Sequence, residues 1–163
     1  MAREEQWVLL AYRLPRIPST PRSTVWRKLK RLGVAQIADG VVALPADDRT
    51  REALDWIAEE VVEHGGDAMV WLGRPAETTA AQNLRARMTD AVAEEYTAVA
   101  AEADATRTAD PATRRRVVAR LRRELHRIAA RDFFPSSQRA NARRAVEDLA
   151  DQRDPAGRPR AQR

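Results

Sequence analysis

The feature that most constrains the fold is a two-residue turn signal, Asp39-Gly40, between two short apolar segments. Residues 34–38 precede the turn and residues 41–44 follow it, and both segments consist mainly of valine, alanine and other apolar residues. Asp-Gly suits the tight turns whose twist matches that of two antiparallel strands. The sequence therefore predicts a β-hairpin, closed by Pro45, within an antiparallel sheet.

One strand and one helix are predicted on each side of this hairpin. Residues 7–12 form a short apolar run that is typical of a buried strand. A helix follows between Thr20-Pro21, which supplies an N-cap hydroxyl and a proline at the first helical position, and Gly33, which ends it. After the hairpin, a second helix ends at Gly65-Gly66, and residues 67–72 form a last strand.

The predicted order β-α-β-β-α-β is that of a ferredoxin-like domain, an antiparallel four-stranded sheet with two helices on one face. We assign residues 1–75 to this domain and residues 76–151 to a helical, arginine-rich extension. Residues 152–163 are expected to be a disordered tail, because they hold prolines and arginines without a large apolar residue. The predicted fold class is therefore α+β.

Two longer helices are predicted in the extension from apolar residues spaced by three or four. The second of them starts at Asp110-Pro111, an N-cap residue followed by proline. The first helix is traced by Leu84, Met88, Ala91, Glu95 and Val99, with Tyr96 alongside, and the second by Val117, Leu121, Leu125 and Ile128.

Positive charge is concentrated at the end of the chain. The formal net charge is +5, but residues 1–75 are neutral, residues 76–112 are acidic, and residues 113–163 carry fifteen arginines against six acidic residues. Arginine keeps its charge near neutral pH and presents a planar fork that fits phosphate and other oxyanions. A one-sided positive field favours polyanionic partners such as nucleic acid.

The predicted nucleic-acid-binding residues are six arginines in the second helix of the extension. Valine and leucine take the inner face of this helix, so the arginines are expected on its exposed side, where they can contact DNA phosphates. The alternative is a solvated helix whose arginines pair with Glu94, Glu95 and Glu102 of the preceding acidic helix. The six residues are Arg115, Arg116, Arg120, Arg122, Arg123 and Arg127.

A second, anion-binding site is predicted beside the proline-rich loop at the start of the first helix. Unpaired N–H groups at a helix N-terminus attract anions, and nearby arginines add to that attraction. The alternative is ordinary ion pairing with Asp39, Asp47 or Asp48. The arginines of the candidate site are Arg13, Arg16, Arg22 and Arg27.

No catalytic, metal or cofactor site is predicted, and we expect the chain not to be an enzyme. It has no cysteine, its two histidines (His64 and His126) lie far apart, and no serine has a recognisable histidine–carboxylate partner. Phosphate-binding loops and dinucleotide fingerprints are absent from the sequence. The four tryptophans, Trp7, Trp26, Trp56 and Trp71, are expected in a core or an interface, with base stacking as the alternative.

The sequence contains no apolar run of membrane-spanning length and no signal-peptide core near the N-terminus. We therefore expect a cytoplasmic protein that does not associate with membranes.

Several segments of the sequence resemble the N-terminal domain of the ChrB chromate-resistance regulators. They include the strand and proline loop of residues 7–22, the hairpin of residues 39–45, Trp71-Leu72-Gly73-Arg74, and Arg131-Asp132-Phe133-Phe134-Pro135. The resemblance implies transcriptional control of chromate resistance, with DNA and the chromate oxyanion as candidate ligands.

The family's longer members carry a C-terminal domain that is usually linked to the chromate response. The resemblance here covers most of residues 7–135, so we expect either a stand-alone regulator or one whose second domain is a separate protein acting in trans. A homodimer is also expected, because small domains of this kind often pair through their sheets or helices.

The first domain also distantly resembles small CRISPR adaptation nucleases, which carry an aspartate after a tyrosine at the end of the first strand. Here Tyr12 is followed by Arg13, whose cation would repel a metal ion. We therefore do not predict nuclease activity.

Overall fold

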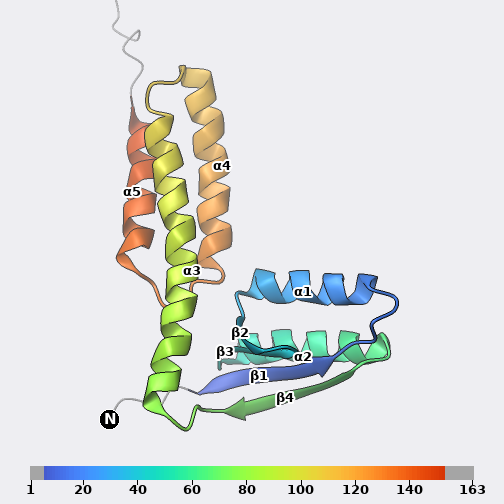
Figure 1. Ribbon diagram of the computed structural model, residues 1–163. Coiled ribbons are helices and arrows are strands. Elements are labelled where there is room, and N and C mark those ends of the chain that lie inside the picture. The colour runs from blue at the N-terminus through green and yellow to red at the C-terminus, as the bar shows by residue number, and fades with distance from the viewer. Residues whose placement is uncertain (1–5, 153–163) are drawn as a thin grey trace, which may run out of the picture. The chain divides into compact units, whose positions relative to one another are not determined.

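The computed structural model describes residues 6–152 and confirms a mixed α+β chain with a four-stranded antiparallel sheet (Figure 1). Nearly all of the predicted tail, residues 153–163, lies outside the described residues. The elements in chain order are β1 (Trp7–Arg13), α1 (Thr20–Leu32), β2 (Ala35–Ala38), β3 (Val41–Pro45), α2 (Asp48–Glu63), β4 (Asp67–Gly73), α3 (Thr78–Ala105), α4 (Pro111–Ala129) and α5 (Ser137–Asp151).

The strands are ordered β2-β3-β1-β4, so β1 lies inside the sheet and β2 and β4 form its edges. The predicted hairpin is present, because β2 and β3 pair antiparallel on either side of Asp39-Gly40. Gly40 has a φ of +74°, and the Tyr12 N–H donates to its carbonyl at 2.7 Å. A Cβ at position 40 would lie 2.4 Å from the Tyr12 carbonyl oxygen, so both backbone geometry and space require glycine there.

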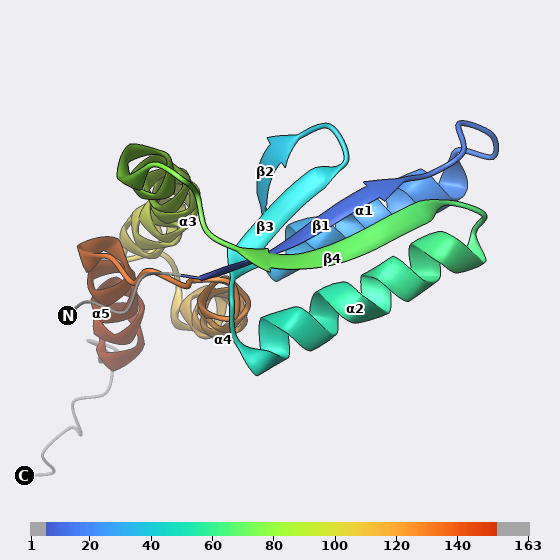
Figure 2. The ribbon, with the colours of Figure 1, turned by 90° about the horizontal axis from the view of Figure 1, so that it is seen from below.

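Helices α1 and α2 cover one face of the sheet (Figure 2). Val8 and Leu10 of β1 lie on this face, and each is fully buried beneath the two helices. The start of α2 is fixed by a capping box in which the Asp47 carboxylate accepts from the Thr50 N–H at 2.7 Å and the Thr50 hydroxyl oxygen accepts from the Asp47 N–H. The helices contribute Val25, Leu29, Leu54, Ile57 and Val61 to this core.

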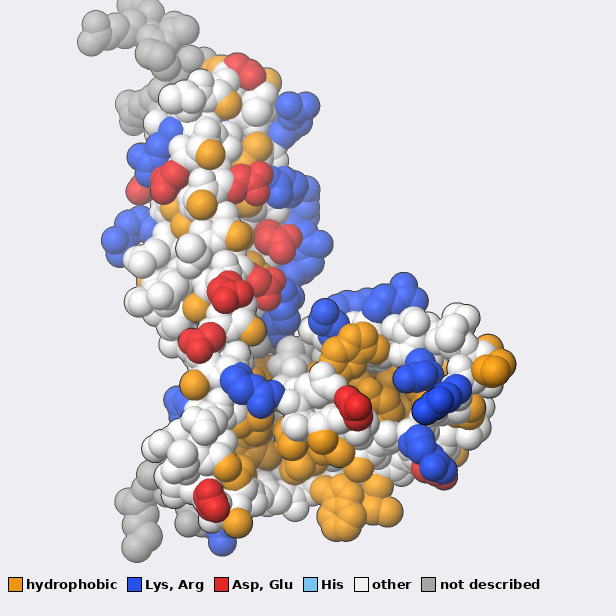
Figure 3. Space-filling model, in the orientation of Figure 1, with side chains coloured by type: hydrophobic (Ala, Val, Ile, Leu, Met, Phe, Trp, Pro, Cys, Tyr) orange, Lys and Arg blue, Asp and Glu red, His pale blue; other side chains and the backbone are white. Residues whose placement is uncertain are grey.

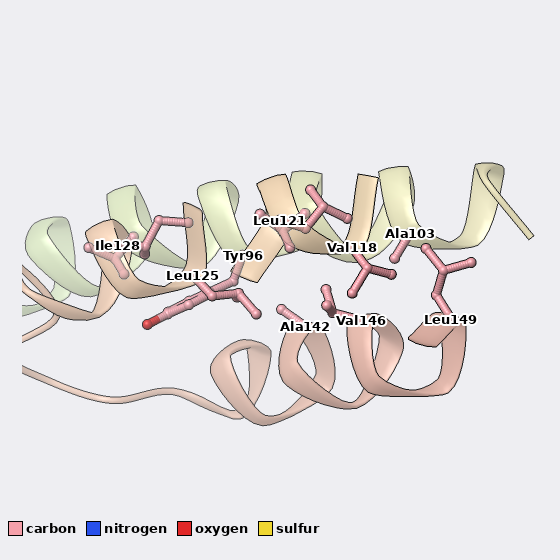
Figure 4. Packing of buried hydrophobic residues seen from close by; sticks show 11 residues of the cluster. Tyr96, Ala103, Val118, Leu121, Leu125, Ile128, Ala142, Val146 and Leu149 are labelled. Atoms are coloured by element: carbon pink, nitrogen blue, oxygen red, sulfur yellow. The ribbon is translucent and has the colours of Figure 1, made fainter. Parts of the chain in front are cut away.

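The structure divides into two compact units between Met88 and Thr89, within α3. The predicted domain limit at residue 75 remains a prediction. The second unit packs α3, α4 and α5 around one apolar core (Figure 4). The expected buried face of α3 is wrong at Ala91, which is exposed, and at Glu95, which is half-buried, because the helix buries Val92, Tyr96 and Ala103 instead.

Across residues 6–152, none of the helices combines the length and the apolar character needed to cross a bilayer.

Candidate nucleic-acid and anion-binding surfaces

The predicted nucleic-acid site lies on α4, whose sequence fixes both its start and its buried face. Asp110 is the N-cap, and its carboxylate accepts from the Thr113 N–H at 3.0 Å. Hydrogen bonds from the Thr113 side chain and backbone lower the pKa of that carboxyl. Pro111 takes the first helical turn, where no N–H partner is required. The buried face consists of Val118, Leu121, Leu125 and Ile128.

The core of the second unit holds α4 in one rotational setting. Figure 4 shows the buried side chains of α4 pointing toward Tyr96 and Ala103 of α3 and toward Val146 and Leu149 of α5. Rotating α4 about its axis would expose leucine and isoleucine, at about 1.5–3 kcal/mol for each side chain moved into water. The packing therefore determines which α4 side chains face the solvent.

Four of the predicted arginines form one row on the side of α4 opposite its buried face. Arg116, Arg120, Arg123 and Arg127, which we call the outward stripe, recur at intervals of four, three and four residues, and all four are exposed. Figure 3 shows basic side chains along the edge of the second unit formed by α4, beside acidic side chains over α3. The structure therefore brings these four residues onto one basic surface.

The other two predicted arginines, Arg115 and Arg122, are exposed but occupy the neighbouring row, toward α5. With Arg114 they line a groove of about 360 Å³ whose apolar wall includes Val118 and Leu149. The six residues thus lie on adjacent rows of one helix, and Arg114, which is not among the predicted residues, lines the same groove as Arg115 and Arg122.

Several of these arginines are already paired with carboxylates. Arg122 makes a two-point contact with Glu147 of α5 at 2.6 and 3.1 Å, which raises the pKa of Arg122 and lowers that of Glu147. Arg120 pairs with Glu102 of α3. All of these side chains are about half exposed, so the ion pairs contribute little to stability and can be exchanged for other anions.

The other three arginines of the outward stripe differ in their hydrogen-bond and ion-pair partners. Arg127 pairs with Glu124 one turn away, at 2.7 Å, and Arg116 donates to the Thr113 hydroxyl at 3.3 Å. Within residues 6–152, Arg123 has no carboxylate at ion-pair distance. Of the acidic partners expected from the sequence, Glu102 is confirmed as a partner of an α4 arginine, whereas Glu95 pairs with Arg131, just beyond α4.

The predicted anion site is only partly assembled. Arg13, Arg16 and Arg22 line one open hollow together with Gly65 and Gly66. Arg27 does not line this hollow, because its guanidinium donates along α1 to the Ser23 carbonyl and the Thr24 hydroxyl. The structure therefore brings three of the four predicted arginines together.

The carboxylate that pairs with this arginine group differs from the expected ones. Arg13 pairs with Asp67, at the start of β4, at 3.2 Å, and both side chains are more than four-fifths exposed. Asp47 instead caps α2. Sequence reasoning missed Asp67 because its approach to Arg13 follows from the β1–β4 register, in which these two residues are directly opposite.

A second hollow, of about 590 Å³, opens beside the start of α1. Arg13 and Arg22 line it together with Tyr12, Ser19 and Asp39. Ser19 is the N-cap of α1 but makes no side-chain capping bond, so the first N–H groups of the helix are not capped by it. Burial raises the pKa of Tyr12, and the nearby charge of Arg22 opposes that shift.

The structure also contains a buried polar cluster that the sequence analysis did not identify. The Tyr96 hydroxyl donates to the Asp132 carboxylate at 3.1 Å, and Arg139 of α5 approaches the same carboxylate at 3.5 Å. Burial, with the Asp132 contact, raises the pKa of Tyr96 to about 12. The one available signal was the segment of residues 131–135, which carries part of the family resemblance.

Two comparisons with known proteins agree on a family. A model of the family described as "Protein ChrB, N-terminal" matches residues 22–110, which is more than half of the chain and ends at the N-cap of α4. Protein ChrB of Cupriavidus metallidurans is 30% identical over 143 residues, which are 85% of this chain and 44% of that protein. The chain thus spans less than half the length of this relative, and no solved structure matches it. Because the family model matches more than half of the chain, and Protein ChrB is 30% identical over 85% of it, the chain belongs to the ChrB family.

Proposed function

We propose that this protein is a DNA-binding transcriptional regulator of the chromate-resistance type, which contacts DNA phosphates through the arginines of α4. The observation that carries the proposal is the outward stripe, four exposed arginines on the face of α4 opposite its core. The role is binding rather than catalysis. We also propose a ferredoxin-like fold for the first unit, supported by its element order and the strand order β2-β3-β1-β4.

The dimensions of the stripe suit a DNA backbone. Arg116 and Arg127 are separated by eleven residues, which at 1.5 Å per residue is about 16 Å along the helix. One DNA strand carries a phosphate about every 3.4 Å along the duplex axis, so the length of the stripe equals the axial rise of about five base pairs. Contacts of this kind give affinity and orientation but no base readout.

The ion pairs do not exclude this role. Arg120 and Arg127 would exchange exposed carboxylate partners for phosphates, and Arg123 has no carboxylate at ion-pair distance among residues 6–152. Four phosphate contacts predict a slope of about −3 to −4 in log K against log salt concentration. Weak dependence on salt would be inconsistent with phosphate contacts by these side chains.

The ion pairs of the α4 arginines favour a second candidate function. In it the protein is a sensor or protein-interaction module of a chromate-resistance system and does not bind DNA. In that role Arg120 and Arg122 stabilise the packing of α4 on α3 and α5 through Glu102 and Glu147. The outward stripe would then meet the acidic face of a protein partner, such as a separate C-terminal-domain protein acting in trans.

For the effector we propose a chromate-like oxyanion held by Arg13, Arg16 and Arg22. Support comes from their shared hollow and from the exposed pair between Arg13 and Asp67, which a stronger divalent anion can displace. Arg27 is not proposed as a ligand, because it bonds along α1.

The test is a fluorescence-anisotropy titration of the full chain with its own upstream DNA and a scrambled duplex. Each duplex is titrated at low and high salt, with and without chromate, and with sulfate as the control oxyanion. A regulator binds the upstream DNA more tightly, loses affinity steeply with salt and shifts with chromate. Absence of binding to both duplexes at low salt would exclude DNA phosphates as the target and leave the protein-interaction role.

A further inference from the structure

The two edge strands of the sheet differ in how they are protected. Edge strands usually avoid pairing with other chains by being short, bulged or interrupted by charge or proline. Strand β2 follows this pattern, since it has four residues and its register shifts between Gln36 and Ala38. Strand β4 has seven residues in unbroken register with β1, and residues 68–73 contain no charge and no proline.

Exposed apolar side chains flank β4 on both faces of the sheet. Met69 and Trp71, 56% and 57% exposed, lie on the face without α1 and α2, because Trp71 is opposite Leu9 in the register. Leu72, 46% exposed, is opposite Val8 and therefore shares the face covered by the helices. Figure 3 shows apolar side chains gathered along the edge of the sheet where β4 runs. A partner that covers both groups must sit against the edge itself.

We propose that β4 pairs with β4 of a second copy of this chain, antiparallel, about a two-fold axis beside Val70. Val70 is the midpoint of Asp67–Gly73, so this register gives every residue of β4 an opposite residue. Met69 then lies opposite Trp71 of the second copy, and Ala68 lies opposite Leu72. Sulfur–aromatic and apolar cross-strand pairs of this kind stabilise antiparallel sheets.

The edge is self-complementary in charge and in geometry. Asp67, whose exposed carboxylate also pairs with Arg13, lies opposite Gly73 of the second copy and beside its Arg74, so a carboxylate and a guanidinium come together at each end of the paired strands. The axis stands perpendicular to the sheet, which keeps the helices of both copies on one side and joins two four-stranded sheets into a continuous eight-stranded one. A different protein would need a matching strand of its own, whereas a second copy supplies it by symmetry.

The first test uses charge exchange across the proposed pair and measures molar mass in solution by sedimentation. Trp71→Lys or Met69→Glu alone places a charge opposite an apolar residue twice per dimer, and each should weaken dimerisation by at least about tenfold. The double variant places Lys opposite Glu and should restore the dimer. Trp56→Lys, at an α2 position that is 66% exposed, is the matched control and should leave the mass unchanged.

The second test fixes the register, using a chain that has no native cysteine. In the proposed register only residue 70 lies opposite the same residue of the second copy. Val70→Cys should therefore form a disulfide-linked dimer under mild oxidation. Leu72→Cys faces Ala68 of the second copy and should not. Three results would each overturn the proposal. The wild-type chain could be monomeric at about 100 µM, both single charge variants could still form the dimer, or cysteines at positions 70 and 72 could cross-link equally.

Discussion

At the scale of single residues, Tyr96 and Asp132 connect the segment after α4 to the core of the second unit. The Asp132 side chain is 2% exposed and accepts from the Tyr96 hydroxyl, while Arg139 brings a positive charge from α5. A buried carboxylate is stable only when it is paired and hydrogen-bonded. These contacts therefore help to fix where α5 begins relative to α4.

Replacing Asp132 with alanine should destabilise the protein by about 2 kcal/mol, because Tyr96 and Arg139 each lose a partner in a buried setting. The free energy of unfolding from urea titration measures this loss. Asp148→Ala, at an exposed position of α5, is the control and should change stability by less than about 0.5 kcal/mol. Equal effects of the two variants would show that Asp132 has no special structural role.

The raised pKa of Tyr96 predicts a dependence of stability on alkaline pH. An unfolded tyrosine ionises near pH 10, whereas the pKa of Tyr96 in the folded chain is about 12. Between these values the folded state binds more protons, so the free energy of unfolding should fall as pH rises from about 10 to 12. Tyr96→Phe should make this fall shallower in urea titrations over that range. An unchanged slope in the variant would contradict a buried, protonated Tyr96.

At the scale of elements, α4 shows what local sequence determines and what it leaves open. Its start and the exposure of its arginines follow from residue spacing and from Asp110-Pro111, and its apolar face does so at Leu121, Leu125 and Ile128. At the fourth predicted position Val117 is only partly buried, and the helix buries Val118 instead. The pairing of Arg122 with Glu147 was not predicted, because it depends on how α5 packs against α4. The hairpin at Asp39-Gly40 was predictable for the same local reason, whereas the approach of Arg13 to Asp67 required the sheet register.

A double-mutant cycle on Arg122→Gln and Glu147→Gln separates a structural role of the arginines from a binding role. Both side chains are more than half exposed, so we expect a coupling energy below about 1 kcal/mol in unfolding experiments. In DNA titrations Glu147→Gln should strengthen binding, since it releases Arg122. A coupling energy several times larger would instead support the protein-packing role of these arginines.

At the scale of the whole molecule, the chain consists of two compact units with separate cores and different charge. The buried face of α3 was predicted incorrectly at Ala91 because a long helix with many alanines gives a weak periodic signal. The family could be predicted from motifs in both units, including residues 7–22 and 131–135, although the family model itself matches residues 22–110. The function of α4 must therefore be tested on this chain directly.

The measurement that most directly tests the central claim is the salt dependence of DNA binding in a stripe variant and a charge-matched control. The stripe variant is Arg116→Gln with Arg123→Gln, and the control is Arg31→Gln with Arg51→Gln, two exposed arginines of the first unit. If the outward stripe contacts phosphates, the stripe variant should lose affinity and its salt slope should become shallower by about 2, while the control keeps the wild-type slope. Equal slopes in the two variants would contradict DNA contact by α4 and assign the binding to the overall charge of the chain.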